Sequence, residues 1–424
     1  MAKTVHNLWP VAALIAVLSG CGQEFAPPSL IDKLRIIGAQ AAPPEIRVTQ
    51  TGGLRLLVVG SDPVEPLCYA WAFCPFAWAK DGNFQCIDPD VQVDLGTSPT
   101  ATIGIFHVLQ ALQNAGKVFD KLGLKPPTGA ATASQKPDLG CQPGGVAPSE
   151  GGPAGTGSFG GADIADMYIL FQVAQAKAVG GTCPASSAAM LATPCVDRDR
   201  CVAGYKRMVI ATPPGACGPF APTVDKPCPK DPAVCAQNRV CGCDGTNYAN
   251  DCERIAAKVS KNHDGRCQSP NENPVLLGLG LRLPATDTIK ALEKGVNWAE
   301  EVTPTVAEGT VLQLWPRFDA KDKQVVGPSQ DPKATKPETE TLVFAWYTDG
   351  GSIDRDRSYD DVPETNWTAP TLAAGRTSQL VRLWVVVRDG RNGTDWLQRT
   401  VLVQKGLQLK ANPLCGTGLL CPTP

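Results

Sequence analysis

The sequence predicts a mainly β protein, with two β-sandwich domains and a small disulfide-rich α+β module between them. Glycine and proline number 42 and 38 in 424 residues, and they separate many short apolar segments, as turns separate the strands of a sandwich. Two distant regions each contain an apolar strand that includes an Ala-Trp pair. The cysteines are densest between these two regions. The length suits two or three domains.

The first twenty residues have the layout of a secretory signal. Lys3 precedes an uncharged apolar run, residues 8–18, which ends at Leu18-Ser19-Gly20-Cys21. This run is too short to cross a bilayer, which takes ~20 residues. The ending resembles the lipobox of bacterial lipoproteins, and the resemblance implies a signal peptide over 1–20, a lipid on Cys21 and attachment to the outer membrane through that lipid. The alternatives are an ordinary signal peptide and a soluble chain with an apolar N-terminal helix.

Charge and cysteine content narrow the class further. The chain has 39 Lys and Arg against 41 Asp and Glu and contains no basic run, so we expect no nucleic-acid partner. If Cys21 carries a lipid, 16 of the 17 cysteines remain. An even number in an exported protein predicts up to eight disulfides.

The first β region is expected over 33–215, after a short tether over 21–32. Strands are predicted at 34–37, 54–59 and 68–74. A helix is predicted over 105–122, with its apolar face formed by residues at three- and four-residue spacings: Phe106, Leu109, Leu112, Val118, Phe119 and Leu122. The Pro-, Gly-, Ala- and Ser-rich stretch 125–161 is typical of a loop. Periodicity does not decide between strand and helix for 167–176; we favour a strand, paired with 205–212.

The second β region is expected over 274–404. Its predicted strands are 275–283, 311–318, 342–347, 380–388 and 396–404. In 380–388 the residues alternate with a period of two, placing Val381, Leu383, Val385 and Val387 on one face. Residues 389–393 tolerate positive φ and predict a hairpin.

Both regions resemble immunoglobulin-like sandwiches. Trp71 in Tyr69-Ala70-Trp71 matches Trp346 in Phe344-Ala345-Trp346, and such folds bury a tryptophan on a central strand. We therefore expect both indoles in the core and not on a ligand. Residues 344–351, 366–370 and 383–390 further resemble the Ig-like or PKD-like domains of bacterial surface proteins.

The cysteine-rich region 217–267 resembles a Kazal-type module. The match rests on Cys241-Gly242-Cys243-Asp244-Gly245, on the ten residues between Cys241 and Cys252, and on the closing His263-Asp264-Gly265-Arg266-Cys267. A module of this size buries little apolar surface, so disulfides replace a core. The resemblance implies the pairs Cys235–Cys252 and Cys241–Cys267. Ile255 stands where the family has another cysteine, and we expect Cys243 to pair with Cys228 instead. Cys217 is then left for Cys201 or Cys195.

In Kazal inhibitors the loop after the second cysteine binds a serine protease. Here that loop comprises Ala236, Gln237, Asn238, Arg239 and Val240, with Gln237 at the specificity position. The loop is shorter than is usual in the family, lacks the customary Pro before Cys241, and is followed by Asn247 in place of Thr. A structural or binding module without inhibitory activity is therefore favoured over an inhibitor.

The sequence favours a non-enzymatic role. It has three histidines, at positions 6, 107 and 263, too few and too scattered for a histidine-based triad or metal site. The G-x-G-x-x-G match at 155–160 lacks a βαβ context. The acidic stretch 354–361 lacks the glycine of a calcium loop and is expected to be a solvated loop. In the tail, 405–424, Cys415 and Cys421 are expected to pair.

We therefore expect no cofactor and no metal. The expected function is that of a lipid-anchored envelope protein that binds or scaffolds an unknown protein partner. A displayed serine-protease inhibitor is the alternative.

Overall fold

The computed structural model describes residues 27–47, 50–60, 62–75, 77–80, 83–86, 88–121, 165–211, 240–242, 246–248, 251–264, 271–282, 296–320, 323–327 and 338–407. This part of the chain is mainly β, as predicted. The predictions for Cys21, for the loop 125–161, for Cys228, Cys235, Cys243 and Cys267, and for the tail with Cys415 and Cys421 lie outside it.

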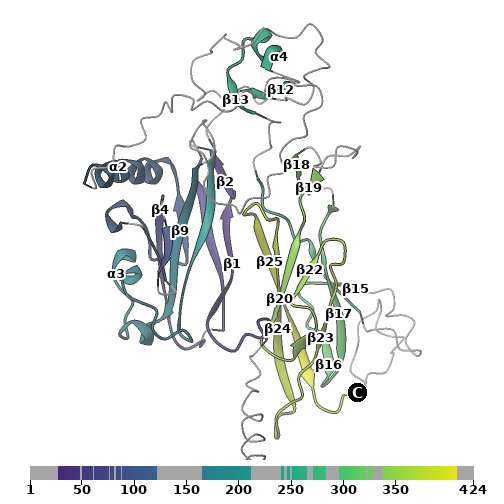
Figure 1. Ribbon diagram of the computed structural model, residues 1–424. Helices are drawn as coiled ribbons and strands as arrows, with labels where there is room; N and C mark the ends of the chain where they lie inside the picture. Colours follow the sequence, from purple (N-terminus) through teal and green to yellow (C-terminus); the bar gives the residue numbers. More distant parts are fainter. Residues whose placement is uncertain are drawn as a thin grey trace, which may run out of the picture.

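The N-terminal sandwich pairs a three-stranded sheet with a five-stranded one (Figure 1). The smaller sheet has the order β1 (Arg35–Ala42), β3 (Gly52–Val59), β8 (Thr100–Ile103). The larger has the order β2 (Glu45–Arg47), β10 (Cys201–Ala211), β9 (Ala165–Gln175), β4 (Leu67–Cys74), β7 (Val93–Gly96). Around them lie the hairpin β5 (Ala77–Lys80) and β6 (Asn83–Cys86), the helices α2 (Ile105–Lys121) and α3 (Ser187–Leu191), and the short helical turns Pro89–Val91 and Ala176–Val179.

The C-terminal sandwich pairs two five-stranded sheets. One has the order β15 (Val296–Trp298), β14 (Gly278–Arg282), β17 (Val311–Arg317), β23 (Thr365–Thr368), β21 (Ser352–Ile353). The other has the order β16 (Thr305–Ala307), β25 (Thr394–Gln404), β24 (Ser378–Arg388), β20 (Val343–Thr348), β22 (Arg357–Tyr359). A two-stranded ribbon, β18 (Val325–Gly327) with β19 (Glu338–Thr339), projects from it.

The two sandwiches share one strand plan. In each, a short strand pairs in parallel with the last strand, β2 with β10 and β16 with β25, while the other pairings that join the five strands are antiparallel. Trp71 on β4 and Trp346 on β20 are each 1% exposed, in the centre of their sandwich. This is the immunoglobulin-like arrangement, and the prediction that both tryptophans are core residues is confirmed.

The strongest strand predictions are also confirmed. The last two strands form the hairpin β24–β25, and the turn between them holds Gly390 at φ 75° and Asn392 at φ 82°. The pair that sequence periodicity left open is antiparallel, β9 with β10. Strand β10 begins at Cys201, four residues before the predicted start at 205.

The helix over 105–122 is confirmed as α2, but its buried face differs from the expected one. Val108 and Ala111 face the core, whereas Phe106 is 82% exposed and Leu109 47% exposed. The helix lies across the end of the sandwich, where small Ala111 permits close approach. His107 accepts a hydrogen bond at Nδ1 from the Gly104 amide, 3.1 Å away, and so helps to fix the start of the helix.

Two further expectations need correction. Cys195 and Cys201 are bonded to each other, so neither is available to Cys217. The end of the expected tether is part of the folded body, because the Ile31 amide donates to the Thr348 carbonyl at 2.7 Å and Ile31 is 5% exposed. Removing this apolar side chain from water stabilises the folded protein.

A small separate unit follows the N-terminal sandwich in the chain. It consists of the sheet β12 (Asn247–Tyr248), β11 (Val240–Gly242), β13 (Lys261–Asp264) and the helix α4 (Asp251–Ala256). Arg254 of α4 is buried, and it donates to the Asp251 carboxylate at 2.7 Å and to the Val259 carbonyl. This buried arginine ties the helix to the turn that follows it.

Candidate functional site

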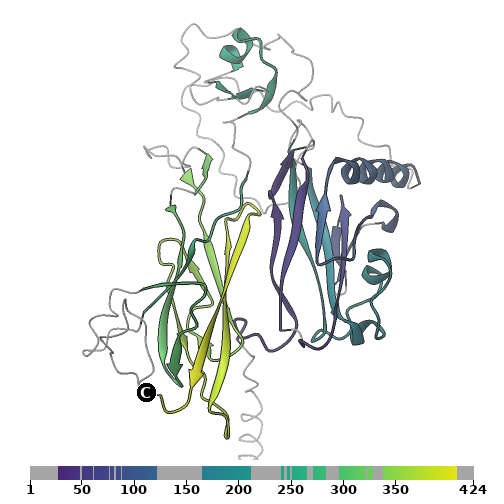
Figure 2. The same cartoon turned by 180° about the vertical axis from the view of Figure 1, so that it is seen from behind.

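The two sandwiches lie side by side, with β1 of the first against β25 of the second (Figures 1 and 2). The apolar centre of this contact contains the buried residues Ile31, Ile37, Val59, Trp384 and Val386. On β24, Trp384 and Val386 occupy the face opposite the sandwich core. Residues 383–387 of that strand are therefore buried on both faces, because the N-terminal sandwich covers the outer one.

Polar contacts surround this apolar centre. Asn273 donates from Nδ2 to the Ala41 carbonyl at 2.8 Å and accepts at Oδ1 from the Thr394 amide, also at 2.8 Å. Arg55 lies 4.3 Å from the centroid of the Trp396 ring and 3.3 Å from the Asp395 carboxylate. Hydrogen bonds of this kind fix the register of two surfaces that apolar burial alone would leave free to slide.

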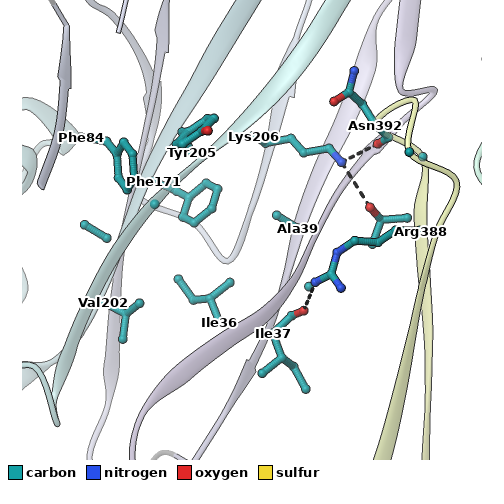
Figure 3. Close-up of a pocket in the computed structure, with 16 residues that line it drawn as sticks. Ile36, Ile37, Ala39, Phe84, Phe171, Val202, Tyr205, Lys206, Arg388 and Asn392 are labelled. Atoms are coloured by element: carbon teal, nitrogen blue, oxygen red, sulfur yellow. Dashed lines mark hydrogen bonds between the residues drawn. The ribbon is translucent and has the colours of Figure 1, made fainter. Parts of the chain in front are cut away.

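A cavity of about 470 Å³ opens beside this contact, within the range of small-molecule sites. Three segments line most of it: residues 36–39 of β1, residues 202–206 of β10, and residues 388–394 around the β24–β25 turn, apart from Asp389 and Arg391. Figure 3 shows Lys206 reaching across the cavity from β10 toward the turn. The cavity is thus shared by both sandwiches.

Aromatic side chains line the cavity on both faces of the β9–β10 pair. Phe84 and Tyr205 lie on the outer face, 4.6 Å apart between ring centroids. Phe171 lies on the inner face, beside Val202. Phe171 packs over Gly204, where a Cβ atom would come within 2.6 Å of the phenyl ring. A side chain at position 204 would displace this ring, so the glycine shapes the wall.

The cationic part of the cavity lining consists of Lys206 and Arg388. The Lys206 ammonium donates to the Asn392 carbonyl and to Thr394 Oγ1, the latter at 3.2 Å. Arg388 donates from Nη2 to the Ile37 carbonyl at 2.8 Å. Burial lowers the pKa of Lys206 to about 8; nearby Asp389 opposes this shift and Arg388 adds to it.

The Asp389 carboxylate, which acts electrostatically on Lys206, accepts hydrogen bonds from its own turn and from Asn271. Asp389 Oδ1 accepts from the amides of Arg391 and Gly393 at 2.7 and 2.8 Å, and Oδ2 accepts from Asn271 Nδ2 at 2.9 Å. The described residues that line the cavity include two cationic side chains and no acidic one. Their formal charge makes the site suitable for an anion.

The residues predicted to bind a protease lie almost wholly outside the described part of the chain. Of the loop 236–240, the structure describes Val240 alone, which is 2% exposed and opens strand β11. Cys241 and Cys252 are both disulfide-bonded. The small sheet and helix of this unit are compatible with the predicted Kazal-like module.

The small unit is inserted at one end of the sandwich pair. The chain enters it after β10, whose last residues 209–211 pair with β2. It returns at Asn271, whose amide donates to Glu45 of β2 at 3.0 Å and whose side chain donates to Asp389. Entry and exit therefore lie together, and Figure 1 draws β11–β13 beyond the end that carries the β24–β25 turn.

The prediction of a solvated loop over the acidic stretch 354–361 is wrong in part, because Arg357–Tyr359 form strand β22 and Ser358 is buried. Its first residue, Asp354, is also held by the fold. Burial alone would raise the pKa of Asp354, but hydrogen bonds from Asn366 and Thr365 outweigh it and lower the pKa. Asp354 Oδ2 accepts from Asn366 Nδ2 at 2.7 Å. Among the described residues, no group of three or more His, Cys, Asp or Glu is placed to hold a metal. No described helix is long and apolar enough to span a bilayer.

Comparisons with known proteins leave the family open. No family model and no curated protein matches the chain. A nucleoside hydrolase-related hypothetical protein from Saccharophagus degradans is 18% identical over 24% of this chain, with a TM-score of 0.15, and the matched part is 22% of that protein. The collagen adhesin from S. aureus is 6% identical, covering 88% of this chain and 93% of that one, with a TM-score of 0.14.

The zebrafish RET cadherin-like domains 1 to 4 are 12% identical, covering 87% of this chain and 75% of that one, with a TM-score of 0.17. Scores this low carry no argument about function. The fold class rests on the strand order and buried tryptophans described above.

Sequence reasoning missed the shared cavity. Lys206 and Arg388 are 182 positions apart in the chain, and no local pattern brings them together. Lys206 stands next to another cationic residue, Arg207, and Arg388 ends the alternating strand 380–388, so a solvated side chain is the ordinary interpretation for both. The one available signal was Gly204, because a glycine inside a strand marks close approach by another group.

Proposed function

We propose that the chain is a lipid-anchored protein of the bacterial outer membrane whose role is to bind or scaffold a partner and not to catalyse a reaction. In this proposal Cys21 carries the lipid, and two Ig-like domains, 33–215 and 274–404, hold a Kazal-like module, 217–267, away from the anchor. The observation that carries the proposal is the position at which the N-terminal segment joins the folded body.

That position is remote from the inserted unit. Residues 29–31 bond to Thr348, the last residue of β20. The other end of this strand, Val343, pairs with Arg388 beside the β24–β25 turn, where the insertion returns. Five residues of strand separate the two, or roughly 17 Å at ~3.3 Å per residue. An anchor at Cys21 would thus approach the body away from the module.

The contact between the sandwiches suits this role. Two domains joined only by a linker would move independently. Here an apolar cluster and reciprocal hydrogen bonds through Asn273 join them. A rigid pair holds the inserted module at a defined distance and so lowers the ordering cost of binding a partner.

The anchor is tested by fractionating cells that express the wild-type chain, Cys21→Ser, or the control Ser19→Ala. We expect wild type and Ser19→Ala in the outer-membrane fraction, because the control keeps a small residue before the cysteine. Cys21→Ser is expected in the soluble or inner-membrane fraction. Outer-membrane recovery of Cys21→Ser equal to wild type would refute the anchor.

The second candidate function is serine-protease inhibition by the loop 236–240. The favouring observations are the disulfides at Cys241 and Cys252 and the three-stranded sheet with one helix. An inhibitor would bind a protease in 1:1 ratio, and Gln237→Pro in the loop would abolish this, whereas the control Gln268→Pro after the module would not. Titration of the full chain against a panel of serine proteases separates the two functions; absence of inhibition removes this candidate.

A further inference from the structure

The cavity between the sandwiches combines features that point to one class of ligand. Its volume of about 470 Å³ accommodates a small organic molecule. Its apolar part is lined by Phe171 and Val202 on the inner face of the β9–β10 pair, and its cationic part by Lys206 and Arg388 (Figure 3). A ligand that matches both parts has an apolar body and a compact anionic head.

Within the described part of the chain, Lys206 and Arg388 each have N–H donors that make no hydrogen bond. Lys206 has three N–H donors, and two are used, on Asn392 and Thr394. Arg388 has five, and one is used, on the Ile37 carbonyl. Because these bonds hold the two side chains in place, a ligand meets a preorganised pair and loses little affinity to ordering them.

The surrounding carboxylates do not compete for this pair. Asp389 accepts three hydrogen bonds from the turn and from Asn271. Asp395 accepts from Arg55 and from the Leu276 amide, and Glu45 accepts from the Asn271 amide. The cations therefore lack a full internal counter-charge, and a carboxylate head would supply one.

We propose that this cavity binds an amphipathic monocarboxylate, with its carboxylate between Lys206 and Arg388 and its apolar body against Phe171 and Val202. The site uses residues of both sandwiches, so occupancy also strengthens their contact. This inference does not depend on the proposed anchor or on the inserted module.

The test uses isothermal titration calorimetry on residues 21–424 carrying Cys21→Ser, so that no protein-bound lipid competes. The probes are decanoate, the neutral 1-decanol and the cationic decyltrimethylammonium. We expect 1:1 binding of decanoate at pH 7, at least tenfold weaker binding of decanol, and no binding of the cation. Equal affinities for decanoate and decanol, or no binding of decanoate, would overturn the proposal.

Variants locate the site. Lys206→Met keeps the length of the side chain and removes its charge, and we expect at least tenfold weaker decanoate binding. The matched control is Arg207→Met, which removes a positive charge from the next residue of β10, on the opposite face of the strand. Equal effects of the two changes would show adventitious charge attraction and refute the site.

A second variant keeps the test decisive if Lys206→Met fails to fold. Val202→Trp fills the apolar part of the cavity and leaves the hydrogen bonds of Lys206 intact. With a melting temperature near that of the parent, this variant should lose most decanoate affinity. Unchanged affinity would place the ligand elsewhere and contradict the assignment.

Discussion

The two sandwiches share a strand plan but are stabilised differently. The N-terminal one sets three strands against five and contains the disulfides Cys68–Cys183, Cys74–Cys86 and Cys195–Cys201. The C-terminal one sets five against five, and residues 274–404 contain no cysteine. Its buried cluster is larger and contains three of the tryptophans, Trp298, Trp346 and Trp367.

The two sandwiches differ in how cross-links and core packing contribute to their stability. A three-stranded sheet covers less of its partner sheet, and the helix α2 covers part of the remainder, while α3 packs on the outer face of the larger sheet. Cross-links restrict the unfolded chain and so compensate for apolar area that is not buried. The C-terminal sandwich has no cross-link, so we expect the packing of its larger buried cluster to be the main source of its stability.

The largest expected effect comes from removing a core tryptophan of the disulfide-free sandwich. Trp346→Ala leaves a cavity and deprives Ser358 of the hydrogen bond from the indole Nε1, 2.9 Å away. We expect a loss of about 3–5 kcal/mol in the free energy of unfolding, measured by denaturant titration. The control Trp315→Ala, at a half-buried position, should cost less; equal costs would contradict packing as the main source of stability.

The next effect concerns the cross-links. Cys68→Ala with Cys183→Ala opens a bond that spans 115 residues, whereas Cys195→Ala with Cys201→Ala opens one that spans 6. Loop-closure entropy predicts a larger loss for the first pair than for the second, and removing a disulfide typically costs about 2–4 kcal/mol. Calorimetric melting of both variants measures this order, and a reversed order would exclude the entropic explanation.

The smallest effect concerns the contact between the sandwiches. The pKa of Lys206 is 10.5 when the chain is unfolded and about 8 in the folded protein. Between these values the unfolded chain binds more protons, so the free energy of unfolding rises with pH. Relative to Lys206→Met, we expect wild type to gain about 1–3 kcal/mol from pH 7 to pH 10.5. Parallel pH profiles of the two proteins would contradict a buried, cationic Lys206.

The sequence predicted the sandwiches well where local pattern and tertiary packing agree. The period of two in 380–388 and the Gly- and Asn-containing turn at 389–393 determine the hairpin β24–β25 without distant partners. Trp71 and Trp346 were predictable as core residues, because burying a large aromatic side chain of a central strand removes much apolar area from water.

Other features depend on distant contacts and were not predictable. The pattern could not show that Trp384 and Val386 would be covered, because the covering surface, β1, lies some 350 residues earlier in the chain. The same holds for the burial of Ile31 and for the cavity, whose lining comes mostly from β1, β10 and the β24–β25 turn. The buried face of α2 was missed because apolar spacing alone does not say which stripe meets the core.

The central claim is that Cys21 begins the mature chain and carries its membrane anchor. Mass spectrometry of the N-terminal peptide from protein purified out of the membrane fraction tests it directly. The account predicts a peptide that starts at Cys21 and whose mass exceeds that of the unmodified sequence by attached acyl chains. A peptide that starts elsewhere, or an unmodified Cys21, would contradict it.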